Sequence, residues 1–210
     1  MKCNYYFDVE IKNLRDDEIA SSILPEIVRI SGKVIKSLHV FNMNTEELYK
    51  NKIAVAFPKY IKEYRKFGNL IRFFAEEKIL LQNFWYFIKD SDVNKNIQIN
   101  VIKSIKDENN VSYYAFVADK LKSRLKKVTS KKNGQEFYHG LTNEKYEEHI
   151  EKIHKCPNLR FRSTSNKQFY SLFIDKKLIK NFSQEKNDNG ELNSFGFSKS
   201  EKLIYLPMFR

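Results

Sequence analysis

Hydrophobic positions in the first 60 residues follow strand spacing, then helix spacing, then strand spacing again. Residues 4–12 alternate weakly between apolar and polar side chains, which predicts a strand. A short apolar run at 53–57, stopped by Pro58, predicts another. Between them, apolar residues recur every three or four positions and predict an amphipathic helix. The members of this stripe are Ile23, Ile27, Ile30, Val34 and Leu38.

The next 50 residues continue this order with a second helix and further strands. Apolar side chains in 70–81 fall at helical spacing, so we expect a helix there. Apolar runs at 84–88 and 97–102 predict two more strands. The order strand–helix–strand–helix–strands is typical of a ferredoxin-like (RRM-like) fold, which many RNA-binding modules use.

We therefore expect an α+β protein of two domains, with the boundary at the polar turn 107–110. Residues 1–108 are the expected ferredoxin-like domain, and 109–210 a second, C-terminal α+β domain. In the second, apolar and basic stripes at helical spacing predict a third helix at 118–132. A basic stripe suits RNA phosphates, although a solvated helix face has the same pattern. The basic stripe consists of Lys120, Arg124, Lys127 and Lys131.

Charge points to the same kind of partner. The formal net charge of the 210 residues is +12. Residues 1–104 hold 17 Lys and Arg against 13 Asp and Glu, whereas residues 105–210 hold 21 against 13. A basic excess concentrated in one half favours nucleic acid as a ligand. An AT-rich coding sequence also raises the Lys and Asn content, but it does not explain this arrangement.

Composition indicates a folded protein of the reducing cytoplasm. An apolar share of 41% is enough for a core, and no run approaches the length of a membrane span. The N-terminus has no signal-peptide pattern. Cys3 and Cys156 give no disulfide framework, and no cofactor is expected. A metal site at His149, His154 and Cys156 is an alternative, but the spacing matches no standard zinc pattern.

The segment 160–174 combines basic, hydroxyl and aromatic side chains. Arg160 and Arg162 carry guanidinium groups that suit phosphate. Ser163 and Ser165 follow at two-residue spacing, so their hydroxyls face the same way on an extended backbone. Residues 168–174 then alternate as a strand does. Taken alone, such serines are turn residues.

Motifs in both halves of the chain resemble, in order, those of the type I-F (Csy-type) CRISPR-associated endoribonucleases, which process precursor CRISPR RNA. In that family Arg-Ser-x-Ser precedes a strand ending in Leu-Phe-Ile, and an aromatic-Gly motif and a Pro-containing apolar end follow. The N-terminal part of the resemblance includes a Leu-His segment. The matching segments here are 6–9, 38–42, 52–58, 160–174, 195–199 and 205–209.

The resemblance implies which residues act. His39 takes the position of the family's catalytic histidine, and a histidine suits proton transfer because its unperturbed pKa is about 6.5. Ser163 would hold the attacking 2′-hydroxyl, and Ser165 would contact the scissile region. Tyr170 would stack on the hairpin base, with Arg162 and the basic stripe as further RNA contacts. Without the resemblance, His39 reads as an ordinary histidine just past the first helix.

Three departures from the family pattern stand out. Phe195 replaces a frequent tyrosine, so a hydroxyl in the active site is lost or moved. The Arg-x-Gln pair that reads bases is not apparent in 111–116, and lysine dominates the basic stripe where the family has arginine. Lysine lacks the bidentate fork, so we expect phosphate attraction to survive better than base reading.

The sequence thus predicts a metal-independent endoribonuclease that cuts CRISPR repeat hairpins. We expect it to stay on its crRNA product as a subunit of a type I-F effector complex, with other effector subunits as partners and no membrane contact. The first alternative is a catalytically inactive subunit that binds the hairpin. The second is a basic DNA-binding or structural protein.

Overall fold

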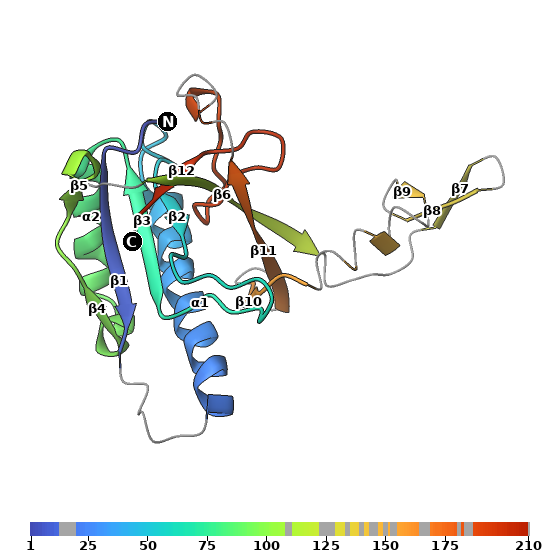
Figure 1. The fold of residues 1–210 in the computed structure, drawn as a ribbon, viewed down its shortest axis with the longest axis horizontal. Helices are drawn as coiled ribbons and strands as arrows, with labels where there is room; N and C mark the ends of the chain where they lie inside the picture. The colour runs from blue at the N-terminus through green and yellow to red at the C-terminus, as the bar shows by residue number, and fades with distance from the viewer. Residues whose placement is uncertain are drawn as a thin grey trace.

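The computed structural model gives an α+β fold, in which the described residues form two larger antiparallel sheets and the helices α1 and α2 (Figure 1). The residues that the structure describes are 1–12, 20–107, 111–121, 129–132, 135–138, 141–142, 147–148, 151, 155–163, 169–179, 182 and 187–209.

The first sheet has the order β2-β3-β1-β4, with all neighbours antiparallel. Its connections, strand–helix–strand–strand–helix–strand with β1 and β3 in the centre, are those of a ferredoxin-like fold, as predicted. A short strand, β5, also pairs with β1. The elements of this part are β1 (Tyr5–Ile11), α1 (Ala20–Asn44), β2 (Ala54–Ala56), β3 (Leu70–Ala75), α2 (Lys78–Lys89), the 3-10 helix η1 (Asp92–Asn96), β4 (Ile97–Ile99), β5 (Lys103–Ser104) and the 3-10 helix η2 (Ile105–Asp107).

Helix α1 packs with the face that its apolar stripe predicts. Ile27, Ile30, Val34 and Leu38 are all buried. An apolar stripe of this width drives a helix against a core more strongly than helix propensity does. The predicted strand at 4–12 is confirmed as β1, and the one at 53–57 as β2.

The helix predicted at 70–81 is confirmed only from residue 78, where α2 begins, and the strand predicted at 84–88 is wrong. Residues 70–75 form strand β3 and not the start of a helix, because β3 is buried between β1 and β2 and reads as a nearly continuous apolar run. Residues 84–88 lie in helix α2 and not in a strand. The buried side chains of α2 fall at helical spacing, and the aromatic residues of its second half obscure this pattern. These buried residues are Leu80, Leu81, Phe84 and Ile88.

The second sheet has the order β10-β11-β6-β12, and its strands β10 and β11 lie on either side of Ser163 and Ser165 in the sequence. The strand predicted at 168–174 is confirmed as part of β11. A third, small sheet of β7, β8 and β9 projects from the body as an arm (Figure 1). The strands are β6 (Ser112–Leu121), β7 (Thr129–Lys132), β8 (Gln135–Tyr138), β9 (Leu141–Thr142), β10 (Asn158–Arg162), β11 (Phe169–Ile179) and β12 (Leu206–Met208).

The helix predicted at 118–132 is wrong at both of its ends. Residues 118–121 belong to β6, where Ala118 pairs with Ile174 and Lys120 with Leu172 of β11. Residues 129–132 form β7. The long ladder with β11 overrides the local helical spacing, because each paired residue gains backbone hydrogen bonds with the other strand. Residues 122–128 lie outside the described part of the chain, so a short helix there stays a prediction.

One hydrophobic core contains side chains from both sides of residue 108. The ring of Phe57 lies 6.1 Å from that of Phe116 and 6.2 Å from that of Phe197. The hydroxyl of Tyr60 donates to the carbonyl of Ile174 at 2.9 Å. These contacts connect the ferredoxin-like part to the second sheet, and the domain boundary at 108 stays a prediction.

None of the described helices has the length and apolar character needed to span a membrane.

Candidate active site around His39

His39 lies within helix α1 and not just past its end, because the helix continues to Asn44. Phe41 explains why the helix continues. Its ring packs against Phe84 at 5.2 Å and Phe87 at 5.6 Å, both on α2. The helix is therefore held by aromatic packing two residues after position 39, and this packing helps to fix the backbone of the histidine.

The imidazole of His39 is held on one edge and on one face. Its Nδ1 lies 2.9 Å from Oγ of Ser194, a hydrogen-bond distance. The ring of Phe195 stacks on it with centroids 4.4 Å apart and an interplanar angle of 11°. Phe195 is almost fully buried, whereas His39 is partly exposed. A histidine fixed by a polar partner and an aromatic neighbour has a defined orientation, which proton transfer requires.

The loop that brings these partners is shaped by Asn193 and Gly196. The Asn193 Oδ1 accepts hydrogen bonds from the backbone N–H of Phe195 at 2.9 Å and of Phe197 at 3.2 Å. Gly196 has φ of +81°, a conformation that L side chains rarely adopt. A Cβ added there would lie 2.6 Å from Cγ2 of Val55, so glycine is also needed for close approach.

Two hydrogen bonds tie this loop to the ferredoxin-like part. The carbonyl of Gly196 accepts from the N–H of Val55 at 2.9 Å. The side-chain amide of Asn42 donates to the carbonyl of Ser194, also at 2.9 Å. Asn42 is fully buried and lies three residues after His39 on α1. Residue 194 is therefore bonded twice by the same face of one helix.

A series of ring contacts continues from His39 to the second sheet. The ring of Phe195 lies 5.3 Å from that of Phe161 on β10, and Phe161 stacks on Tyr170 of β11 at 5.5 Å. Tyr170 is half-buried, and this burial raises the pKa of its phenol. Ser163 follows β10 directly and is partly exposed. His39 and Tyr170 are thus connected through the rings of Phe195 and Phe161. Ser163 lies two residues after Phe161 in the sequence.

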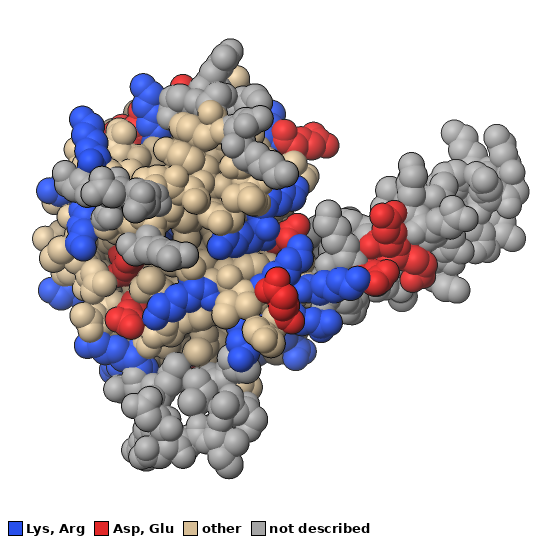
Figure 2. All heavy atoms as spheres, viewed as in Figure 1, with Lys and Arg blue, Asp and Glu red and all other residues tan. Residues whose placement is uncertain are grey.

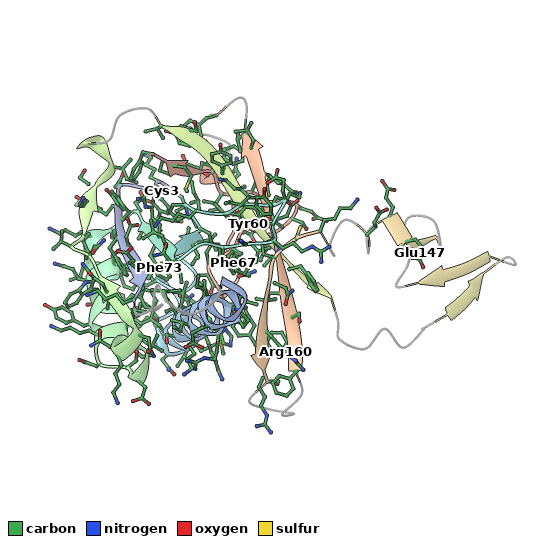
Figure 3. All side chains as sticks on the ribbon, turned by 60° about the horizontal axis from the view of Figure 1, so that its bottom comes forward. Cys3, Tyr60, Phe67, Phe73, Glu147 and Arg160 are labelled. Atoms are coloured by element: carbon green, nitrogen blue, oxygen red, sulfur yellow. The ribbon has the colours of Figure 1, made fainter. Side chains whose placement is uncertain are left out.

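Basic side chains border this set on β10. Arg160 and Arg162 are exposed, while Leu159, which precedes them, and Phe161, which lies between them, are buried. Their guanidinium carbons lie 4.5 Å and 6.0 Å from the ring centroid of Phe169, on the paired strand β11. Figure 3 shows Arg160 toward the end of the β10–β11 pair, away from Glu147 on the arm. On the face drawn in Figure 2, Lys and Arg side chains gather where the arm joins the body.

The structure describes only two of the other candidate residues, Lys120 and Lys131. Lys120 lies in β6, with its backbone opposite Leu172, and Lys131 lies in β7 on the arm. Ser165, Arg124 and Lys127 lie outside the described residues. The structure therefore does not bring the basic stripe together on one helix.

No three or more His, Cys, Asp or Glu side chains in the described part of the chain could together hold a metal ion. Of the alternative metal ligands, His149 and His154 lie outside that part. Cys156 is buried, and this burial raises the pKa of its thiol.

Comparison with protein families identifies the chain. A family model described as CRISPR-associated protein (Cas_Csy4) matches residues 6–209. The chain belongs to the Cas_Csy4 family. Membership implies a part in CRISPR RNA processing. Among curated proteins no match is found.

The Cas_Csy4 match includes both halves of the candidate site, with His39 near its start and the loop 193–197 near its end. The sequence analysis missed Ser194, the partner of the His39 imidazole. A signal was present, because a hydroxyl stands directly before the aromatic-Gly motif of Phe195 and Gly196. What the sequence could not supply was the contact itself, which joins residues 155 positions apart.

Proposed function

We propose that this Cas_Csy4 protein is a metal-independent endoribonuclease that cuts precursor CRISPR RNA at a repeat hairpin. The observation that carries the proposal is the state of His39, a partly exposed imidazole oriented by Ser194 and Phe195. An ordinary surface histidine on a helix does not need a loop 155 positions along the chain to fix its ring. A residue that transfers protons needs a fixed orientation relative to the reacting groups.

The proposed reaction uses the RNA's own nucleophile. The 2′-oxygen attacks the adjacent phosphorus in line and loses its proton, while the bond to the 5′-oxygen breaks and that oxygen gains a proton. The products are a 2′,3′-cyclic phosphate and a 5′-hydroxyl. His39 exchanges one of these protons, and Ser163 holds the 2′-hydroxyl in line. Ser165 contacts the scissile region, and Arg160 and Arg162 supply positive potential.

The hairpin would be held by the exposed side of the second sheet and by the arm. Tyr170 offers its ring to a base at the foot of the hairpin, and Arg162 lies nearby on the paired strand. We expect further phosphate contacts from Lys120, Arg124, Lys127 and Lys131. A large contact of this kind keeps the product bound, so the protein would stay on its crRNA as a subunit of a type I-F effector complex.

A specific observation favours a second candidate function, a subunit that binds the hairpin without cutting it. Phe195 stands where the family often has tyrosine, and it is 2% exposed with no hydroxyl to offer. If the chemistry depends on that hydroxyl, only binding remains. Ser194 weighs against this reading, because it places a hydroxyl against His39 from the neighbouring position.

Single-turnover cleavage of a repeat hairpin RNA in excess EDTA tests the proposal. We expect cutting at the rate seen with Mg²⁺, and a 2′,3′-cyclic phosphate on the upstream product. An RNA with a single 2′-deoxy substitution at the cleavage site should bind equally well and stay intact. Activity that is lost in EDTA and returns with Mg²⁺ contradicts the mechanism. Tight binding with no cutting under either condition supports the binding subunit instead.

A further inference from the structure

We propose that Ser194 is a positioning residue that sets which nitrogen of His39 exchanges a proton. Its Oγ accepts a hydrogen bond from Nδ1–H of His39, so the reacting nitrogen is Nε2. The 2.9 Å separation between Nδ1 and Oγ establishes the contact, and the requirements of the proton-transfer cycle favour this direction of the hydrogen bond. The choice of direction rests on the proposed function, but the tautomer of His39 is a property of the free protein and can be measured without RNA.

Ser194 is fixed well enough to do this. Its carbonyl is bonded by the buried side-chain amide of Asn42, whose own Oδ1 accepts from the N–H of Asn51 at 3.2 Å. Because Asn42 lies three residues after His39, both side chains reach residue 194 from adjacent turns of α1. A backbone held in this way keeps the hydroxyl within reach of the imidazole.

The direction of the hydrogen bond follows from the reaction cycle. A histidine that exchanges a proton alternates between neutral and cationic forms, and the cation donates from both nitrogens. If Nδ1–H donates to Ser194 in both forms, the bond persists while Nε2 gains and loses the proton. A serine that donated to Nδ1 would have to turn its hydroxyl at each cycle. The first arrangement needs no reorganisation, which is what a preorganised site requires.

Phe195 and Ser194 together supply the aromatic ring and the hydroxyl that a single tyrosine carries. The ring of Phe195 lies flat on the imidazole and hinders a flip of the histidine. The hydroxyl beside the imidazole comes from position 194. The replacement of tyrosine by phenylalanine at 195 therefore leaves His39 with both an aromatic neighbour and a hydroxyl neighbour.

Nitrogen-15 NMR of histidine-labelled free protein tests the assignment without RNA. The His39 signals are identified by their loss in His39→Gln. We expect wild type to show the Nδ1–H tautomer at neutral pH, and Ser194→Ala to shift His39 toward the Nε2–H form. Ser194→Thr should restore the wild-type signals. The matched control is Ser198→Ala, because Ser198 has a buried hydroxyl on the same segment that accepts from the N–H of Ile204 at 3.0 Å. An unchanged His39 tautomer in Ser194→Ala overturns the proposal, as does an equal shift in Ser198→Ala.

Cleavage then measures the catalytic consequence. We expect Ser194→Ala to slow single-turnover cutting about 10- to 100-fold, the value of one hydrogen bond to a group that becomes charged, with a changed pH–rate profile. Ser194→Thr should recover most of the rate, and hairpin affinity should stay within about fivefold of wild type in both variants. If the wild type cuts no RNA but Ser194 still controls the tautomer, the enzymatic function fails and the positioning role stands. If the wild type cuts and Ser194→Ala cuts equally fast, the positioning role fails alone.

Discussion

The two parts of the candidate site are built in different ways. On the His39 side, a helix and the loop 193–197 enclose the imidazole through buried contacts, with Leu38 and Phe197 completely covered. On the β10–β11 side, buried and exposed positions alternate, and the exposed ones at 160 and 162 are arginines. The first part fixes one functional group, whereas the second presents charge and aromatic surface to solvent. Mutations of His39 should therefore affect mainly catalysis, and mutations of Tyr170 or Arg162 mainly RNA binding, whereas Ser163, directly after β10, is proposed to act in catalysis.

The largest expected effect comes from the His39 side. His39→Ala should slow single-turnover cleavage by on the order of 10²–10⁴, the usual contribution of general acid–base catalysis. Hairpin affinity should change by less than about 1 kcal/mol, because one neutral side chain is removed. If His39→Ala lowers hairpin affinity as much as it lowers the cleavage rate, His39 also contributes to RNA binding, and the two parts of the site do not have separate roles. If His39→Ala cuts at the wild-type rate, His39 is not the proton-transfer residue, and His139, His149 and His154 are the histidines to test next.

Gly196 tests whether the enclosure of His39 is as tight as its geometry indicates. Gly196→Ala forces a side chain into φ of +81° and against Leu38, Val55 and the carbonyl of Ile53, at 2.6–2.8 Å. We expect a loss of roughly 2–4 kcal/mol in the free energy of unfolding, measured by urea denaturation. Gly32→Ala on α1 is the matched control. Its Cβ would meet only the carbonyl of Arg160 at 3.8 Å, so it should stabilise the protein by about 0.5–1 kcal/mol.

Tyr170 tests the binding side. Tyr170→Ala should weaken hairpin binding by roughly 1–3 kcal/mol, the value of stacking on one base, as measured by filter binding. At saturating protein the cleavage rate should stay near that of wild type, because the contacts of His39 are unchanged. Tyr170→Phe keeps the ring and should bind as wild type does. If Tyr170→Ala lowers the saturated rate and leaves affinity unchanged, Tyr170 belongs to the chemistry and the separation between the two parts fails.

The smallest expected effect is that of one exposed arginine. Arg162→Gln should make the dependence of log affinity on log salt shallower by about 0.9, borrowing the value for one phosphate contact in duplex DNA. Lys78→Gln is the control, because Lys78 is exposed on α2, away from the arm (Figure 1). Equal slopes in wild type and Arg162→Gln would show that Arg162 makes no phosphate contact.

The fold was predictable where one face of an element is buried and the other is not. The stripe of α1 and the alternation in β1 each show a period, so both were found. Strand β3 was missed because it is buried throughout, from Ile71 to Ala75, so its side chains show no alternation. The equally buried β2 was found because Pro58 ends its apolar run, and no proline follows β3. The end of β6 was missed because its pairing with β11 is a long-range interaction that local spacing does not contain.

The site was predictable only in part, for a similar reason. His39 and Ser163 were reached through the resemblance to a family, since neither has a local pattern that distinguishes it from an ordinary helix or turn residue. The contacts of His39 with Ser194 and Phe195 join distant parts of the chain. They depend on how the helix and the loop meet in three dimensions, and no periodicity along the sequence records that.

The distance along the chain between His39 and Ser194 also has a consequence for synthesis. The two residues are 155 positions apart, and ribosomes add roughly 5–20 residues per second. For roughly 8–30 seconds after His39 is made, its imidazole has neither the hydroxyl nor the aromatic neighbour that orient it. A nascent chain is therefore without its oriented histidine until residues 194 and 195 have been added. Cellular RNA near the ribosome is exposed to the assembled site only once the loop 193–197 has been made.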